Sequence, residues 1–253
     1  MPFTLSHAVV AAPLHYVSGQ RLPYAAIVIG SMAPDLHRLF TTNTSNATHE
    51  WQHIFNLTLW IGLAFCLLWY GLFRPFIYRC LGLQDPIHLP NLKTALIFIF
   101  TLMLGVVMGI CTHLIWDGLT HDDFRTFIFH DALRQEITLF SHSYPLHRIL
   151  QLLSSALTLP FLIWMCIVYY QRHKTLNVPR QTKRYAILSL LLSVFIGLGS
   201  SLHYAFNLSI FAWQNELYYH SGRSINEFFQ GFLFSFSFAA VVFWVLRKKE
   251  IFH

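Results

Sequence analysis

Three polar side chains close an otherwise apolar stretch of the chain, Ile97 to His121. His113, Asp117 and His121 are four residues apart, so on a helix they share one face, one turn apart. Two imidazoles and a carboxylate on one face are ligands for a divalent metal such as zinc. Ionisable residues within a membrane span are costly, which favours a functional site. The alternative is a hydrogen-bond network at the helix end, in which Asp117 orients a histidine.

Further candidates for metal binding lie in the first 54 residues. Asp35 follows Ala33-Pro34, and proline disfavours helical geometry in the residue before it, so we expect a turn there. At that turn Asp35 is either a ligand or a helix N-cap. His7 lies among small apolar residues, and His49 precedes the first long apolar run. Each histidine alone is explained as a buried or interfacial residue, but several in one vicinity favour a site.

Residues 49–53, His-Glu-Trp-Gln-His, match the HExxH pattern of zinc proteases. The pattern fixes only three positions, and the chain contains 15 histidines, so chance matches are easy. It also lies at the mouth of an apolar segment rather than on a helix followed by a third ligand. A protease is therefore a minor alternative. Glu50 and Asp117 are the candidates for a general base that acts on a metal-activated water; the catalytic residue itself is left open.

Five apolar segments must position these side chains. They cover about residues 55–73, 92–116, 145–170, 185–204 and 228–246, and each is long enough to cross a bilayer. Residues 1–54 form a preamble with one helix to about Val17 and a short apolar segment, Leu22 to Met32, that is too short to span. We predict an all-α polytopic membrane helical bundle of about five transmembrane helices plus short N-terminal buried or re-entrant helices. It is expected to be a single integral membrane domain over 1–253, with a preamble (1–54) and a bundle (55–253).

Several boundaries can also be predicted. Arg74-Pro75 is expected to end the first span, because proline interrupts helical hydrogen bonding. Residues 41–48 are a loop by composition, and residues 122–145 are expected to be a loop of mixed charge. In the latter region His142, His147 and Arg148 lie near a span end, where Arg148 is either a phosphate ligand or, more simply, an interface anchor.

The composition excludes most soluble classes. Charged residues make up only 11% of the chain, against about 25% in soluble domains, and 55% of the residues are apolar. The formal charge of +6 lies in short loops rather than in a basic stripe interleaved with aromatics, so nucleic acid is not an expected partner. The four cysteines form no CxxC pair, and we expect them to pack in the core.

The basic residues predict an orientation. Alternation across five spans puts eleven Lys and Arg residues on one side and six on the other, and the richer side is expected to be cytoplasmic. The eleven lie in residues 74–93, 172–184 and 247–249. This topology brings all the candidate ligands to the outer face. We therefore expect a bacterial inner-membrane protein with a cytoplasmic C-terminus and with its N-terminus and site outside.

Several motifs also resemble a family. The motifs are MPFTLSH at the start, GSMAPD at 30–35, His49 before the first span, THLIWDGLTH at 112–121 and PLHRILQLLSS at 145–155. They resemble an uncharacterised bacterial family of integral membrane proteins, a domain of unknown function. More distantly, the chain is similar to membrane-bound metal-dependent hydrolases, which share an N-terminal His, a Pro-Asp, a His before a span and an HxxxD. That resemblance implies a ligand set of His7, Asp35, His49, His113 and Asp117, and it includes neither Glu50 nor His53.

Together these features predict a membrane-embedded metal-binding protein. The expected metal set is His7, Asp35, His49, His113, Asp117 and His121, which would hold one or two divalent ions, with zinc the expected metal. The expected activity is hydrolysis of a phosphoester or of a lipid or envelope ester at the outer membrane face. The alternative is a non-catalytic membrane protein whose His/Asp cluster is structural or binds an ion. Membrane lipid and a lipid or phosphoester substrate are the expected partners.

Overall fold

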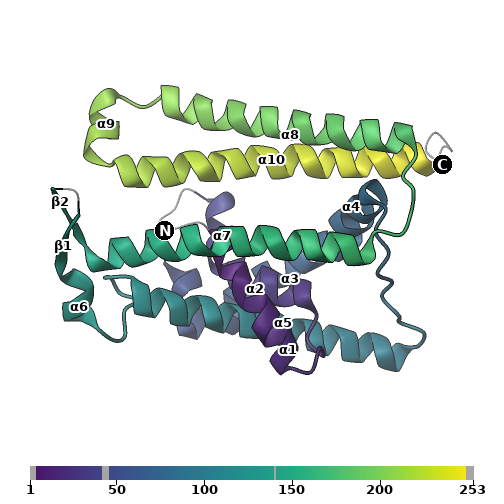
Figure 1. Ribbon diagram of the computed structural model, residues 1–253, viewed down its shortest axis with the longest axis horizontal. Helices are drawn as coiled ribbons and strands as arrows, with labels where there is room; N and C mark the ends of the chain where they lie inside the picture. The colour runs from purple at the N-terminus through teal and green to yellow at the C-terminus, as the bar shows by residue number, and fades with distance from the viewer. Residues whose placement is uncertain (1–3, 42–45, 140, 249–253) are drawn as a thin grey trace. The chain divides into compact units, whose positions relative to one another are not determined.

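The computed structural model describes residues 4–41, 46–139 and 141–248, and almost all of its regular structure is helical (Figure 1). Within the described residues, five helical runs are long and apolar enough to cross a membrane. Many large apolar side chains on these helices are exposed, as expected of surfaces that face lipid. The chain is therefore an integral membrane protein with an all-α polytopic fold, which confirms the predicted fold class.

The regular elements follow one another along the chain. The N-terminal part has η1 (Thr4–Val10), α1 (Ala11–Val17), α2 (Tyr24–Leu36), η2 (His37–Leu39), η3 (Ala47–His49), η4 (Trp51–His53), η5 (Ile54–Thr58), α3 (Leu59–Leu68), η6 (Trp69–Phe73) and α4 (Arg74–Leu81). The rest has α5 (Leu92–Thr120), α6 (His130–Arg134), β1 (Glu136–Leu139), β2 (His142–Pro145), α7 (Leu146–His173), α8 (Arg180–Phe206), α9 (Ile210–Asn215) and α10 (Leu217–Lys248).

The chain divides into two compact units. The first unit comprises Met1–His37, Asn43–Cys66 and Ile87–Tyr169, and the second comprises Arg38–Thr42, Leu67–Pro86 and Tyr170–His253. The prediction of one domain over 1–253 stays a prediction.

In the first unit, α2 crosses α5 at close range (Figure 1). Gly109 of α5 lies against the backbone of α2, where a Cβ atom would meet the Ile27 carbonyl and would lie 2.5 Å from the Ser31 nitrogen. Gly30 of α2 makes the reciprocal contact with the Val106 backbone. Small residues at such crossings let membrane helices approach closely. The crossing therefore fixes the α2 residues just after Gly30 next to the α5 residues just after Gly109, which are the residues of the site.

In the second unit, α8 and α10 run side by side and are joined through α9 (Figure 1). Gly197 of α8 lies against Phe228 of α10, where a Cβ would lie 2.8 Å from the Phe228 carbonyl oxygen. Phe76 and Cys80 of α4 pack with Phe243 of α10 in a buried apolar cluster. This unit is therefore built mainly by apolar and aromatic packing.

The expectation of a turn at Pro34 is wrong. The α2 helix runs from Tyr24 to Leu36, and Pro34 and Asp35 lie within it. Proline removes the helical hydrogen bond that residue 34 would otherwise donate to the Gly30 carbonyl, which costs the helix stability. Packing of α2 on α5 compensates for that loss, so Asp35 stays on a buried helix rather than capping a new one.

The expectation that Arg74-Pro75 ends the first span is also wrong. The helical run continues from Trp51 to Leu81. It passes through two π turns, η5 and η6, and Pro75 occupies the first turn of α4, where a missing N–H costs little. The bond pattern therefore changes along the run without ending it.

Residues 122–145, predicted as a loop, contain α6 and a two-stranded antiparallel hairpin in which Ile137 pairs with Tyr144 and Thr138 with Ser143. The other spans are longer than predicted; α5 reaches Thr120 and α10 begins at Leu217. Residues 42–45 of the predicted loop at 41–48, residues 1–3 of the MPFTLSH motif and Lys249 of the basic tail lie outside the described residues.

Candidate metal centre

Four segments of the first unit bring histidines and carboxylates to one place. His7 comes from η1, Asp35 from the last turn of α2, His49 from the end of η3, and both His113 and Asp117 from the last two turns of α5. All five side chains are buried. Residues far apart in the sequence therefore meet where the α2–α5 crossing places them.

Asp35 is held from two sides. Its Oδ2 accepts a hydrogen bond from Thr4 Oγ1 at 3.0 Å, and its Oδ1 lies 3.1 Å from His49 Nε2. The other ring nitrogen of His49 lies 3.2 Å from Thr48 Oγ1. A carboxylate bound to a histidine in this way fixes the ring orientation, as in many metal sites. His49 can therefore ligate an ion by exchanging this bond, or orient Asp35 by keeping it.

His113 has a defined tautomer. Its Nδ1 lies 2.8 Å from the carbonyl oxygen of Ser31, and a carbonyl only accepts, so Nδ1 carries the hydrogen. Its Nε2 is buried, lies 3.4 Å from Asp117 Oδ2, and has no hydrogen-bond partner among the described residues. In the neutral ring, a nitrogen lone pair thus faces a carboxylate, an arrangement that either a bound cation or a proton on Nε2 would relieve.

Asp117 is the centre of the cluster. Arg125 Nη1 donates to its Oδ2 at 2.7 Å. The Nε2 atoms of His7 and His49 each lie 3.9 Å from one of its carboxylate oxygens. Its Oδ1 is buried without a hydrogen-bond partner in the described part of the chain. One carboxylate oxygen is therefore held by a guanidinium while the other remains available to an ion.

Two overlapping triads have the spacing of metal ligands. His7, Asp35 and His113 form one, and His49, His113 and Asp117 form the other; within each, one donor atom per residue lies within 4.8 Å of the others. The rings of His7 and His113 stack with centroids 4.0 Å apart. Both triads use His113, whose Nδ1 is already occupied, so it can bind one ion through Nε2. The donor set of imidazoles and carboxylates suits a divalent metal such as zinc.

His121 occupies a different position from the other candidates. It is the residue directly after α5, and its backbone is extended, so it does not continue the helical face of His113 and Asp117. Its Nδ1 lies 3.6 Å from Asp117 Oδ1 and 3.2 Å from the Asp117 carbonyl oxygen, and it belongs to neither triad. The structure thus places His121 beside one ligand candidate; its role as a ligand stays a prediction.

Burial sets the protonation of His7 and His121, which lie outside the spanning helices. Desolvation, together with the neighbouring His113 ring, lowers the pKa of His7 to about 3. Desolvation also lowers the pKa of His121 to about 4, although the Asp117 carboxylate opposes it. Both imidazoles are therefore neutral near pH 7, the form that binds metals.

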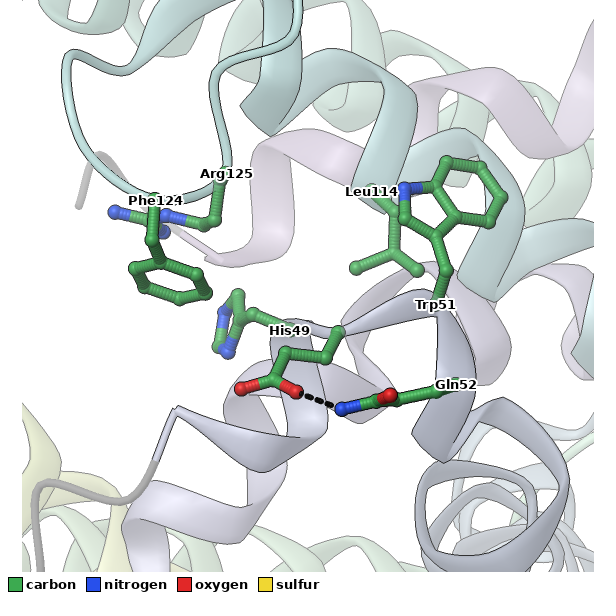
Figure 2. A pocket seen from close by; sticks show the side chains of 7 residues that line it. His49, Trp51, Gln52, Leu114, Phe124 and Arg125 are labelled. Carbon is green, nitrogen blue, oxygen red and sulfur yellow. Dashed lines mark hydrogen bonds between the residues drawn. The ribbon is translucent and has the colours of Figure 1, made fainter.

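A pocket of about 320 Å³ adjoins the cluster at His49 (Figure 2). Phe124 and Arg125 face Trp51 and Leu114 across it, with His49 between the two sides. Glu50 and Gln52 complete the lining, and Gln52 Nε2 donates to Glu50 at 2.6 Å. The pocket gives a ligand access to the edge of the cluster.

The HExxH geometry is absent. In zinc proteases the two histidines share one helix face, but here Glu50 has an extended backbone that separates η3 from η4. His49 points into the cluster, while His53 pairs with Glu50 at 3.4 Å and is about one-third exposed. The protease alternative is therefore wrong, and Glu50 lines the pocket without lying on a ligand helix.

Sequence reasoning missed Arg125 and the Ser31 carbonyl. Arg125 lies four residues beyond His121 among aspartates, which resembles an ordinary charged loop, and a backbone carbonyl leaves no sequence signal. His142, His147 and Arg148, considered because they lie near a span end, belong to neither triad and do not line the pocket.

Comparison with known proteins identifies one family. The model of the family described as "Domain of unknown function (DUF4184)" matches residues 1–248. No curated protein and no solved structure matches the chain. Because the family description states no activity, the similarity to metal-dependent hydrolases stays a prediction.

Proposed function

We propose that this chain, which belongs to the family described as Domain of unknown function (DUF4184), binds zinc at its His/Asp cluster and hydrolyses a phosphoester or a lipid or envelope ester. One observation carries the proposal. The Nε2 atom of His113 and an oxygen of Asp117 are buried together without hydrogen-bond partners among the described residues, next to further imidazole and carboxylate groups. A bound cation would satisfy both atoms, and unsatisfied buried polar groups are otherwise costly.

The residues of the cluster fall into two roles in this proposal. His113, Asp117, His7, Asp35 and His49 supply the ligand atoms, of which four suffice for zinc. Ser31 fixes the His113 tautomer, and Thr4 holds the Asp35 carboxylate. Zinc bound there would lower the pKa of a water ligand and polarise an ester or phosphoryl oxygen. Because His113 offers one nitrogen, we expect one ion per chain.

Glu50 is the stronger candidate for the general base. It lines the pocket beside His49, and its side chain is about one-third exposed. Asp117 is almost completely buried and already accepts from Arg125, so it suits a ligand better than a base. A Glu50→Gln variant is therefore expected to keep its metal and lose turnover.

Metal analysis tests the proposal directly. Protein purified in an uncharged detergent is expected to contain about one zinc ion per chain, as four ligands bind one ion. The double variant His113→Ala, Asp117→Ala is expected to contain almost none, and the matched variant His142→Ala, Asp131→Ala to retain it. Wild-type protein that binds no divalent metal would refute the site. Turnover of phosphodiester and lipid ester substrates, lost in the double variant, is the separate test of catalysis.

A non-catalytic alternative is favoured by a different observation. The His49–Asp35 and Arg125–Asp117 contacts already pair both buried carboxylates within the protein. With a protonated His113 the cluster would be a self-contained polar network that ties α2, η3 and α5 together. That alternative predicts that the purified protein contains no metal. It also predicts that the variant His113→Ala, Asp117→Ala loses stability rather than activity.

For orientation, we propose that the site lies at the outer face of the bacterial inner membrane and that the C-terminus is cytoplasmic. The bias of Lys and Arg among the loops supports this arrangement. A reporter enzyme that works only in the cytoplasm is expected to be active when it is fused after residue 253.

A further inference from the structure

The segment after α5 turns back onto the helix and delivers Arg125 to the cluster. Phe127 N–H donates to the Gly118 carbonyl at 3.4 Å, and the Phe127 ring occupies the space that a Gly118 side chain would need. Thr126 Oγ1 donates to the His121 carbonyl and accepts from the Asp123 N–H. These contacts fix the loop, so the position of Arg125 is set in advance rather than left to a mobile side chain.

Arg125 has donors to spare. Its Nε and Nη2 bind the Asp123 carboxylate, and its Nη1 donates to Asp117. Each Nη carries two hydrogens, so a guanidinium held in this way keeps further N–H groups for another acceptor. The side chain lines the pocket and is only 10% exposed, which places a permanent positive charge at the pocket wall.

The pocket has a polar interior and an aromatic rim. His49, Glu50 and Arg125 are its ionisable lining residues, and Trp51 and Phe124, each about half exposed, are aromatic lining residues. Trp51 begins one spanning run, and Phe124 follows the end of another by four residues. Aromatic residues at span ends lie at the membrane–water interface. The pocket therefore adjoins the level of lipid headgroups.

From these contacts we infer that the pocket binds the phosphate head of an amphiphile, with Arg125 positioning the phosphate and with Phe124 and Trp51 contacting the apolar part. Arginine matches phosphate oxygens with parallel N–H donors. A volume of about 320 Å³ accommodates a headgroup but not a whole lipid, so acyl chains would extend past the aromatic rim. This inference rests on the proposed function, since it names the substrate class of the same site.

Binding measurements separate the two halves of the inference. The probes for zinc-loaded protein in uncharged detergent are dioctanoyl phosphatidic acid, inorganic phosphate and uncharged dioctanoylglycerol. Phosphatidic acid is expected to bind at least tenfold more tightly than either of the others. Phosphate that binds as tightly as phosphatidic acid would indicate a soluble phosphoester and overturn the amphiphile. Dioctanoylglycerol that binds equally well would overturn recognition of the phosphate.

Variants assign the roles of the two residues. Arg125→Gln is expected to lower the affinity for both phosphate-containing probes about tenfold or more. Arg125→Lys is expected to lower it by less, because lysine keeps the positive charge but lacks the parallel N–H donors of a guanidinium. Arg134→Gln is the matched control, since Arg134 is largely exposed in the same loop region and pairs with Asp122. Phe124→Ala is expected to weaken phosphatidic acid but not inorganic phosphate, with the exposed Phe129→Ala as its control.

Two further readouts keep the outcomes distinct. Melting temperature shows whether Arg125→Gln is folded. If it is not, Arg125→Lys is used in its place. The inference is overturned if folded Arg125→Lys and Phe124→Ala both bind phosphatidic acid as tightly as the wild type does. Zinc content of each sample tests the proposed function separately. If the protein contains zinc but the Arg125 variants bind phosphate as tightly as the wild type, only the inference is refuted. If the wild-type protein contains no zinc, the proposed function is refuted.

Discussion

Two pairs of helices in this protein pack closely at glycine residues, but only one of the two crossings adjoins the candidate site. In the first unit, α2 and α5 approach closely at Gly30 and Gly109 and bury His113 and Asp117 just beyond the contact. In the second unit, α8 and α10 approach at Gly197, but the buried polar side chains in their described parts are hydroxyls and His220. Close backbone contact alone therefore does not create a site.

The difference lies in what surrounds each crossing. Around α2 and α5, η1 and η3 add His7 and His49, and a return loop adds Arg125, so each ionisable group has neighbours of complementary chemistry. Around α8 and α10, a row of stacked aromatic rings that includes Phe228, Phe232 and Phe236 fills the space. Buried charges persist in a membrane protein only where others compensate them.

The largest effect is expected from widening the first crossing. Gly109→Val puts a side chain into the backbone of α2 at Ile27 and Ser31, so we expect a loss of about 3 kcal/mol in the free energy of unfolding. Zinc should be lost as well, because Ser31 no longer holds His113. Gly199→Val in α8 is the control, since nothing lies within 4 Å of its Cβ position. Equal unfolding curves for both variants in detergent would contradict the importance of this crossing.

Much of this crossing could not be predicted from sequence. Long apolar runs identify the spans because a bilayer selects for them, and the polarity of His113 and Asp117 within such a run identifies the candidate site. Which helix packs against which depends on three-dimensional fit, however. The same limit explains the wrong turn at Pro34, since the packing of α2 on α5 overrides the local effect of proline.

The loop after α5 shows the same limit for the site. Arg125 reaches Asp117 because Phe127 packs on Gly118 and turns the chain back, a tertiary contact with no periodic signal. His121 shows the converse error of reasoning from spacing. Its position four residues after Asp117 predicts a shared helix face, but α5 ends at Thr120. Spacing rules hold only as far as the element continues.

The pH dependence of stability tests whether His7 is buried in its neutral form. In the metal-free protein, burial lowers the pKa of His7 to about 3, below its ordinary value of 6.5. Between these values the unfolded chain binds a proton that the folded chain refuses, so stability falls as the pH falls below 6.5. His7→Gln removes this contribution. From pH 7 to pH 4 in EDTA, wild type should therefore lose about 3 kcal/mol more than the variant. Parallel losses would contradict the burial of a neutral His7.

Zinc affinity tests whether His121 belongs with the triads. Because His121 lies beside Asp117 and belongs to neither triad, His121→Gln is expected to lower zinc affinity about tenfold, as loss of a supporting group does. Asp117→Asn, which alters a triad member, should lower it by about 100-fold or more. Competition with a chelating dye measures both, with exposed Asp131→Asn as control. Equal losses in the two variants would instead make His121 a ligand, as its spacing predicts.

The smallest effect on stability is expected from a substitution in the second unit, which tests whether that unit is free of metal ligands. Tyr204 Oη and His220 Nδ1 lie 2.8 Å apart, and Trp213 packs against the His220 ring. Tyr204→Phe removes one neutral hydrogen bond, which should cost about 1 kcal/mol in unfolding free energy. Zinc content should not change, because His220 belongs to neither triad. If zinc content fell while the protein stayed folded, the second unit would hold metal ligands too, and the contrast between the two crossings would fail.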